Sequence, residues 1–287
     1  MLWNSKAKGR IMINEIGCTT AALFLTLLAF TPATTFGEST GSGPLIVAHR
    51  GASADAPENT LPAFKLAWKQ GADAVEGDFY LTKDGKIVCI HDADTARTAG
   101  VTNVIAETTL DELRKLDVGL WKGEQWKGTK IPTIAEVFET VPAGKKIYIE
   151  VKVGPEIIQP LLEEIEKSDL RDEQVVVISF RQEVVRTIKA TAPQFKGFLL
   201  SGLKEDESGK IDPSIEKVLD VLQRTGADGF SSTRNVINQP FIQQIMDAGY
   251  EYHVWTVNDL ETAERFKEWG AKSITTNVPK TLGSVRD

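Results

Sequence analysis

Two carboxylates stand two positions apart, Glu76 and Asp78, inside an apolar run that predicts a strand over residues 74–82. Because side chains on a strand alternate between its two faces, both carboxylates point to the same face. Ionised acids side by side on a buried face repel each other unless a cation or a shared proton neutralises them. The pair therefore predicts a divalent metal ion, which is the simplest way to neutralise both charges.

A histidine is expected beside this pair of acids. The strand is followed by Asp84-Gly85, which is typical of a two-residue type I′ turn in a β-hairpin. Counting back along the two strands of that hairpin places Asp78 opposite His91, on the same face of the sheet. The alternative is a surface hairpin with incidental charges, and the otherwise apolar strands argue against it.

A second histidine follows an earlier strand. The apolar run of residues 45–48 has the length and flanks of a buried strand, and it leads directly into His49-Arg50-Gly51. A helical pattern then runs from Thr60 to the stop signal Gly71. Strand, loop, helix and the next strand form one βαβ unit, so His49 is expected where a strand gives way to a loop.

The rest of the chain alternates strand and helix patterns from residue 131 onward. The expected strands cover residues 147–151, 175–179, 197–200, 229–231, 251–257 and 273–276, and the expected helices cover residues 157–166, 182–190, 215–223, 241–248 and 260–269. With the two early strands these patterns make eight repeats. They predict an α/β fold, a (β/α)₈ TIM barrel with a hairpin after the second strand. No glycine-rich phosphate motif follows a strand, which argues against a dinucleotide site.

In a barrel of this type, functional side chains gather at the carboxyl ends of the strands. Glu150 and Lys152 stand two apart at the end of one expected strand, so they share a face and can point into the same mouth as the acid pair. Three carboxylates offer only oxygen ligands, so the expected cofactor is one divalent cation, Ca²⁺ or Mg²⁺, rather than zinc. The alternative is a structural ion pair between Glu150 and Lys152 at the barrel rim.

The other candidates are assigned by chemical type. His49 and His91 can hold or release a proton near neutral pH, so they are the expected general acid and general base, in an order that the sequence leaves open. Arg50 and Lys152 are expected to receive phosphate oxygens. Glu58 and Asn59 are expected to orient Arg50 and its loop, and the third histidine, His253, is expected to be a hydrogen-bonded structural residue.

Composition describes an ordinary globular protein of 287 residues, 41% of them hydrophobic and 25% charged. A net charge of −7 leaves no basic surface for a phosphate backbone, so no nucleic-acid partner is expected. Of the two cysteines, Cys18 lies in a predicted leader and Cys89 lies on the hairpin. The mature protein is therefore expected to have no intramolecular disulfide.

Residues 1–37 have the pattern of a secretory signal peptide, because basic residues precede an apolar run over residues 21–30 and small residues follow. That run is too short to span a membrane comfortably, so we expect an exported protein, periplasmic or secreted, with no stable membrane insertion after signal removal. An uncleaved anchor and a lipoprotein signal at Cys18 are the alternatives. One domain is expected over residues 44–287, with a polar insertion at about residues 93–130.

The chain resembles the glycerophosphodiester phosphodiesterase family from about residue 45 to residue 279. The resemblance rests on motifs that occur in the family's order and at its usual separations. They are His49-Arg50-Gly51, Pro57-Glu58-Asn59-Thr60, Gly71-Ala72-Asp73, Glu76-Gly77-Asp78, Thr82-Lys83-Asp84-Gly85, His91-Asp92, Ile131-Pro132-Thr133, Glu150-Val151-Lys152, Ser179-Phe180 and Val254-Trp255-Thr256-Val257-Asn258. One position departs from the family pattern, since Asn277 stands where the family usually has Asp.

The resemblance implies a metal-dependent enzyme that hydrolyses glycerophosphodiesters, the deacylated head groups of phospholipids, to glycerol 3-phosphate and an alcohol. Trp255 would either pack in the barrel or stack on the carbon face of the glycerol. The insertion resembles one that family members carry at this point, and it would either shape the substrate entrance or pack on the barrel end by its tryptophans.

Two alternative functions remain. The same site could cleave lysophospholipids or sphingomyelin, or a periplasmic binding protein could capture phosphodiesters without turnover.

Overall fold

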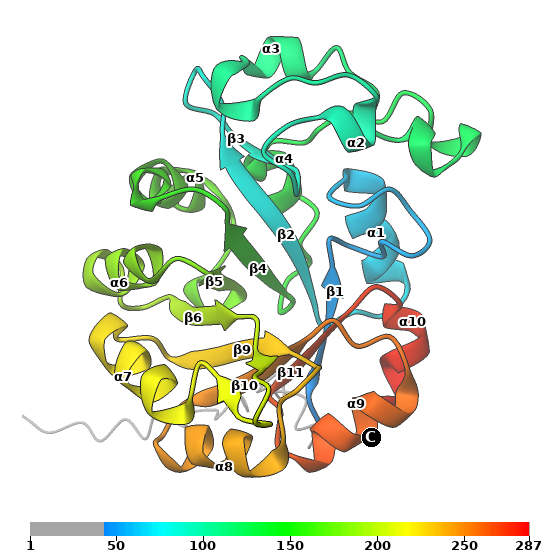
Figure 1. Ribbon diagram of the computed structural model, residues 1–287. Coiled ribbons are helices and arrows are strands. Elements are labelled where there is room, and N and C mark those ends of the chain that lie inside the picture. The colour runs from blue at the N-terminus through cyan, green and yellow to red at the C-terminus, as the bar shows by residue number, and fades with distance from the viewer. Residues whose placement is uncertain (1–42, 287) are drawn as a thin grey trace, which may run out of the picture. The chain divides into compact units, whose positions relative to one another are not determined.

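The structure, a computed structural model, describes residues 43–286. The predicted signal peptide, residues 1–37, lies outside the described residues. Eight parallel strands within residues 43–286 close into a barrel, and helices surround it (Figure 1). The fold is therefore the predicted (β/α)₈ barrel. In the described part of the chain, no helix has the length and hydropathy that crossing a membrane requires.

The barrel strands are β1 (Leu45–His49), β2 (Ala74–Leu81), β4 (Lys146–Val151), β5 (Val175–Ser179), β6 (Lys196–Ser201), β9 (Gly229–Thr233), β10 (Glu251–Trp255) and β11 (Ser273–Thr276). Each pairs in parallel with the next in that order, and β1 pairs with both β2 and β11, which closes the barrel. Strands of such a barrel are covered on both faces, so they are expected to be near-continuous apolar runs. All of β5 is buried, in agreement with this rule.

Helices follow the strands and lie outside the barrel (Figure 1). They are α1 (Leu61–Lys69), α4 (Ile134–Phe138), α5 (Ile158–Lys167), α6 (Gln182–Thr191), α7 (Ile215–Thr225), α8 (Gln239–Asp247), α9 (Leu260–Glu268) and α10 (Pro279–Leu282), with the 3₁₀ helices η4 (Pro155–Ile157), η5 (Asp172–Gln174) and η6 (Gly283–Arg286). Local sequence determines where they begin. At α1, for example, the side chain of Thr60 caps the helix by accepting a hydrogen bond from the backbone N–H of Ala63.

Every strand and long helix predicted from the sequence is present, with ends close to the expected ones. A small antiparallel hairpin between β6 and α7 was not predicted. It consists of β7 (Lys204–Glu205) and β8 (Ile211–Asp212), and Oδ1 of Asp206 accepts hydrogen bonds from the backbone N–H groups of Ser208 and Lys210 in its turn. Two-residue strands carry no periodic signal, because alternation cannot be recognised over so few positions.

The hairpin after β2 has a register that differs by one residue from the predicted one. Cys89 of β3 (Ile87–Cys89) pairs with Phe79, and the backbone N–H of Ile90 donates a hydrogen bond to the carbonyl oxygen of Asp78. The prediction that Asp78 faces His91 was therefore wrong, because Ile90 takes that position.

The turn of this hairpin explains the difference. It contains three residues, 83–85, because the N–H of Thr82 donates to the carbonyl oxygen of Lys86 across the turn. The Oγ1 atom of Thr82 also accepts a hydrogen bond from the N–H of Lys86 and donates one to Oδ1 of Asp84. Gly85 has a φ of +72°, the left-handed conformation that ends a three-residue loop of this kind and that glycine adopts readily.

The insertion forms a layer of short helices next to β3 (Figure 1). It contains α2 (Ala96–Ala99) and α3 (Leu110–Leu113) with the 3₁₀ helices η1 (Ile105–Glu107), η2 (Leu120–Lys122) and η3 (Glu124–Trp126). A cluster of buried aliphatic side chains joins it to β3: Val88, Ile90, Ile105, Leu113, Val118 and Ile131. Trp121 is 42% exposed and Trp126 is only partly buried. The aliphatic cluster, not the pair of tryptophans, therefore attaches the insertion.

A glycine between the two carboxylates of β2 allows close packing on this strand. A Cβ atom at Gly77 would lie 3.0 Å from Sγ of the buried Cys89 and 3.1 Å from Cζ of Phe64 on α1. Contacts this short would force the neighbouring side chains to move. Gly77 thus lets α1 and β3 pack directly on the part of β2 that carries Glu76 and Asp78.

We predict that Gly77→Ala lowers the free energy of unfolding by about 1–3 kcal/mol, because the added methyl group overpacks the interface with Phe64 and Cys89. Chemical denaturation of each variant measures this free energy. The same substitution in a Cys89→Ala background should cost less, because loss of the sulfur makes room for the methyl group. Equal costs in the two backgrounds, or a Gly77→Ala protein as stable as wild type, would contradict the close packing.

Candidate active site

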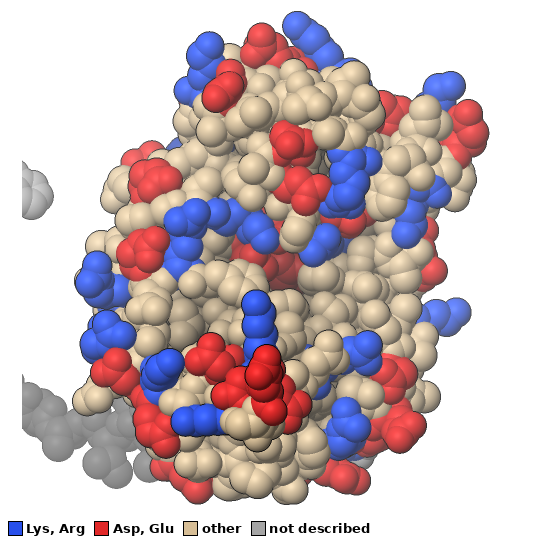
Figure 2. All heavy atoms as spheres, in the orientation of Figure 1, with Lys and Arg blue, Asp and Glu red and all other residues tan. Residues whose placement is uncertain are grey.

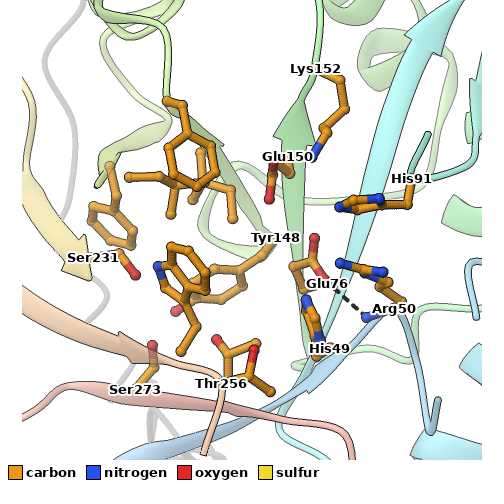
Figure 3. Close-up of a pocket in the computed structure, with 16 residues that line it drawn as sticks. His49, Arg50, Glu76, His91, Tyr148, Glu150, Lys152, Ser231, Thr256 and Ser273 are labelled. Atoms are coloured by element: carbon orange, nitrogen blue, oxygen red, sulfur yellow. Dashed lines mark hydrogen bonds and ion pairs between the residues drawn. The ribbon is translucent and has the colours of Figure 1, made fainter. Parts of the chain in front are cut away.

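A cavity of about 320 Å³ opens at the carboxyl ends of the barrel strands (Figure 3). Figure 2 shows a hollow in this face of the molecule, with acidic side chains inside it and basic side chains nearby. One side of the cavity is charged and consists of His49, Arg50, Glu76, His91, Glu150 and Lys152. The other side is mostly aromatic and aliphatic and includes Tyr148, Ile178, Phe180, Phe198, Leu200 and Trp255. All the predicted site residues line this cavity except Asp78, which is buried beside it.

Strand register brings three carboxylates together. The strands β1, β2 and β4 are neighbours in the barrel, and their register pairs His49 with Glu76 and Asp78 with Glu150. One carboxylate oxygen from each of the three acids lies within 4.8 Å of the others. Glu76 and Asp78 are 2% and 1% exposed, so water cannot screen their charges.

Burial and mutual repulsion change the protonation of these acids. Burial, followed by the charges of Asp78 and Glu150, raises the pKa of Glu76 well above its usual value. Burial and the charge of Asp78 likewise raise the pKa of Glu150 to about 7. At Asp78 burial acts in the same direction, but Lys152 and Arg50 outweigh it and the pKa is lowered. The cationic side chains of the site therefore do not suffice to keep all three acids ionised.

The three acids fit a hard divalent cation. They offer carboxylate oxygens, which Ca²⁺ and Mg²⁺ prefer as ligands. Among the residues that the structure describes, Oε1 of Glu76 is buried and has no hydrogen-bond partner. A buried oxygen atom without a partner is rare in a folded protein unless an ion or a water molecule binds to it. Glu76, Asp78 and Glu150 could therefore hold one cation.

Arg50 and Lys152 contact the acids on the charged side of the cavity. Nζ of Lys152 is 2.7 Å from Oε1 of Glu150 and 3.2 Å from Oδ1 of Asp78. Nε of Arg50 is 3.3 Å from Oδ2 of Asp78. Lys152 therefore does not form a simple ion pair with Glu150 at the barrel rim, because it also bridges to an acid of the neighbouring strand.

Residues of the loop after β1 form hydrogen bonds to the acids and to Arg50. Arg50 and Asn59 have φ values of 56° and 57°, which are uncommon outside glycine and persist where surrounding contacts hold them. At Arg50 this conformation lets the backbone N–H donate to Oε2 of Glu76 at 2.9 Å. Nδ2 of Asn59 donates to Oδ2 of Asp78 at 2.8 Å, and Nη1 of Arg50 donates to Oε1 of Glu58 at 3.0 Å. Asn59 and Glu58 thus hold Asp78 and Arg50 in place.

His49 has a neutral hydrogen-bond partner. Its Nδ1 lies 2.7 Å from Oδ1 of Asn277, and Oγ of Ser53, which donates to the backbone oxygen of His49, lies 3.1 Å from the same amide oxygen. Since that oxygen only accepts hydrogen bonds, Nδ1 carries the proton and Nε2 keeps its lone pair. Burial and the positive charge of Arg50 lower the pKa of His49 to about 4. The ring is therefore neutral at physiological pH.

His91 has a charged partner instead. Its Nδ1 lies 2.7 Å from Oδ1 of Asp92. The other oxygen of Asp92 accepts a hydrogen bond at 2.6 Å from Nε of Arg97, which belongs to the insertion. Asp92 therefore links the His91 ring to the insertion.

The aromatic side of the cavity contains Trp255 and Phe180, whose rings meet edge to face with centroids 5.6 Å apart. Trp255 lines the cavity as well as packing on the barrel interior, and within residues 43–286 its Nε1 has no hydrogen-bond partner. His253 is different, because it is buried, bonds to Oγ of Ser273 at 2.8 Å and stacks on Phe198. It is the structural histidine that the sequence predicts.

Sequence reasoning missed two of these partnerships. Asn277 meets His49 across 228 positions of the chain, and its departure from the family pattern was the available signal. Arg97 lies five positions after Asp92, but nothing in that spacing distinguishes it from Arg114, the other arginine of the insertion. Both contacts depend on how loops fold back over the barrel mouth.

Known proteins share this fold and sequence. Residues 49–281 match the model of the glycerophosphoryl diester phosphodiesterase family. A glycerophosphodiester phosphodiesterase of Caldanaerobacter subterraneus subsp. tengcongensis is 35% identical over 245 residues, covering 83% of this chain and 96% of the relative. One from Bacillus subtilis is 30% identical over 258 residues, covering 84% and 86%.

Solved structures agree with this assignment. A phosphodiesterase of Oleispira antarctica, in complex with the product sn-glycerol-3-phosphate, matches with a TM-score of 0.76 at 28% identity, covering 85% of this chain and 97% of that one. A glycerophosphodiester phosphodiesterase of Thermotoga maritima matches with a TM-score of 0.67 at 28% identity, covering 84% and 97%. The chain therefore belongs to the glycerophosphodiester phosphodiesterase family and is an enzyme of that type.

Proposed function

We propose that the protein hydrolyses glycerophosphodiesters to glycerol 3-phosphate and an alcohol, with one divalent cation, Ca²⁺ or Mg²⁺, on Glu76, Asp78 and Glu150. The observation that carries the proposal is the convergence of three acids, two cationic side chains and two histidines on one cavity. The complex of the Oleispira antarctica relative with sn-glycerol-3-phosphate supports the same product here.

Arg50 and Lys152 are the proposed phosphate ligands. Both line the cavity beside the acids, and a guanidinium or ammonium group forms strong charge-assisted hydrogen bonds to phosphate oxygens. When bound, a divalent cation supplies further positive charge, which polarises the phosphoryl group and lowers the pKa of a hydroxyl group beside it. Trp255 on the opposite side offers a flat apolar surface for the carbon atoms of the glycerol.

His49 is the proposed general base. Its ring is neutral at pH 7, because its pKa is about 4, and the contact of Nδ1 with Asn277 leaves Nε2 to accept a proton. By analogy with related phosphodiesterases on this fold, that proton comes from the glycerol 2-hydroxyl. A bond forms between this oxygen and phosphorus while the bond from phosphorus to the leaving alcohol breaks.

His91 is the proposed general acid. Asp92 holds Nδ1 of its ring, and the protonated ring gives a proton to the oxygen of the leaving alcohol. The products of this step are the alcohol and a cyclic phosphodiester of glycerol. A water molecule then opens the cyclic ester, with the two histidines in reversed roles, and glycerol 3-phosphate is released.

The test is the release of glycerol 3-phosphate from several glycerophosphodiesters, with and without a chelator. We predict that the chelator abolishes activity, that Ca²⁺ or Mg²⁺ restores it, and that Glu76→Gln or Asp78→Asn removes it. Protons and the cation compete for Glu150, whose pKa is about 7, so more cation should be needed as the pH falls below that value.

The exposed Glu207, outside the cavity, supplies the matched control, and Glu207→Gln should leave activity unchanged. Full turnover in excess chelator after dialysis would overturn the proposed metal dependence. Turnover of lysophospholipids in place of glycerophosphodiesters would favour the alternative substrate class.

A second prediction concerns the base. Asn277→Asp places a carboxylate 2.7 Å from Nδ1 of His49, which stabilises the imidazolium ion and raises its pKa from about 4. Because a general base acts in its neutral form, the acidic limb of the kcat/KM profile should move to higher pH. Measurement at saturating cation separates this limb from titration of the three acids.

The control for this prediction is Asn277→Ala, which removes the amide without adding a charge and should not move the limb upward. An acidic limb at the same pH in Asn277→Asp and wild type would show that His49 is not the base.

The location of the protein is also a proposal, which the pattern of residues 1–37 supports. We expect an exported protein, periplasmic or secreted, whose mature chain begins between Thr34 and Gly43. N-terminal sequencing of the protein from the periplasm or medium provides the check. An exported chain that begins at Met1 would refute a cleaved signal peptide.

A further inference from the structure

One side chain of the insertion connects it to the charged side of the cavity. Arg97 of α2 donates from Nε to Oδ2 of Asp92 at 2.6 Å, from Nη2 to Oε1 of Glu58 at 2.7 Å and from Nη1 to Oε2 of Glu58 at 3.0 Å. The guanidinium group thus uses all three of its nitrogens on two carboxylates. Those carboxylates belong to different segments, the loop after β1 and the segment after β3.

Each of these carboxylates holds a residue of the site. The second oxygen of Asp92 contacts Nδ1 of His91 at 2.7 Å. Oε1 of Glu58 accepts a hydrogen bond from Nη1 of Arg50 at 3.0 Å. Arg97 is therefore one contact away from a proposed acid and from a proposed phosphate ligand, although it does not line the cavity itself.

The contacts of Arg97 are better suited to orienting Asp92 and Glu58 than to attaching the insertion to the barrel. The side chain of Arg97 is 44% exposed, and ion pairs made by exposed side chains contribute little to stability. The aliphatic cluster already joins the insertion to β3. The planar guanidinium fork, however, fixes the direction of both carboxylates, which a flexible ammonium group would not do.

We propose that Arg97 is a positioning residue of the active site: by holding Asp92 and Glu58 it sets the orientation of His91 and Arg50. The insertion would then complete the site through one side chain without touching the substrate. This inference rests on the proposed function for the roles of His91 and Arg50. The competing explanation is a bridge that only attaches the insertion to the barrel.

The test compares Arg97→Ala with a matched arginine of the same insertion. Arg114 also pairs with a glutamate outside the insertion, Glu136 of α4, and its exposure is similar, but in the described part of the chain no hydrogen bond or ion pair joins these two residues to one that lines the cavity. We expect Arg97→Ala to lower kcat by about 10- to 100-fold, as loss of an orienting partner does at other sites, with Tm close to wild type. Arg114→Ala should keep kcat.

Three further measurements distinguish orientation from attachment. Arg97→Lys should remain impaired, whereas millimolar guanidinium ion should partly restore kcat in Arg97→Ala, because the vacated position is open to solvent. The effects of Arg97→Ala and Asp92→Asn on kcat should be non-additive, since one acts through the other. A normal kcat in Arg97→Ala, full activity in Arg97→Lys, or additive effects in the double variant would each overturn the proposal.

A measurement that does not depend on turnover tests the positioning role of Arg97 independently of the proposed reaction. Nitrogen-15 spectra of the His91 ring should broaden or split in Arg97→Ala and stay sharp in Arg114→Ala. If wild-type protein releases no glycerol 3-phosphate, the proposed function fails while this comparison still decides the positioning role. An unchanged His91 spectrum in Arg97→Ala refutes that role even if the enzyme is active.

Discussion

Repulsion among three buried carboxylates is the constraint on which the rest of the site depends. Glu76, Asp78 and Glu150 converge because parallel strand register places Asp78 beside Glu150, while the two-residue period of β2 puts Glu76 on the same face as Asp78. Burial alone would protonate them, so positive charge must lie close by. Arg50, with its left-handed backbone, places a positive charge next to Asp78. Lys152, two residues after Glu150 on the chain, places a second one next to Glu150. The same groups are then available to an anionic substrate.

The two histidines show how one side-chain type acquires two different properties in a single cavity. Asn277 offers His49 an uncharged acceptor, and burial with the nearby Arg50 keeps that ring neutral. Asp92 offers His91 a carboxylate. The difference lies in the group next to Nδ1, an amide at His49 and a carboxylate at His91, and the proposed roles of base and acid rest on it.

The insertion combines an apolar attachment with polar contacts to the barrel mouth. Its aliphatic cluster includes residues of β3, while Arg97 contacts the carboxylates beside His91 and Arg50. Lys122 likewise donates from Nζ to the backbone oxygen of Ser53, whose hydroxyl group bonds to the backbone oxygen of His49. The insertion is thus connected to both histidines through short series of hydrogen bonds.

Sequence by itself determined the alternation of strands and helices, and with it the barrel, because apolar runs and helical periodicity are local properties. It also determined that Glu76 and Asp78 share a face, since the side-chain period of a strand is two residues. Only the tertiary structure decided the hairpin register, where the side chain of Thr82 favours a three-residue turn, and the contacts of Asn277 and Arg97. These depend on loop conformation and on burial, which arise from contacts between segments far apart in the chain. For the same reason the low pKa of His49 and the raised pKa of Glu150 could not be read from residue type or spacing.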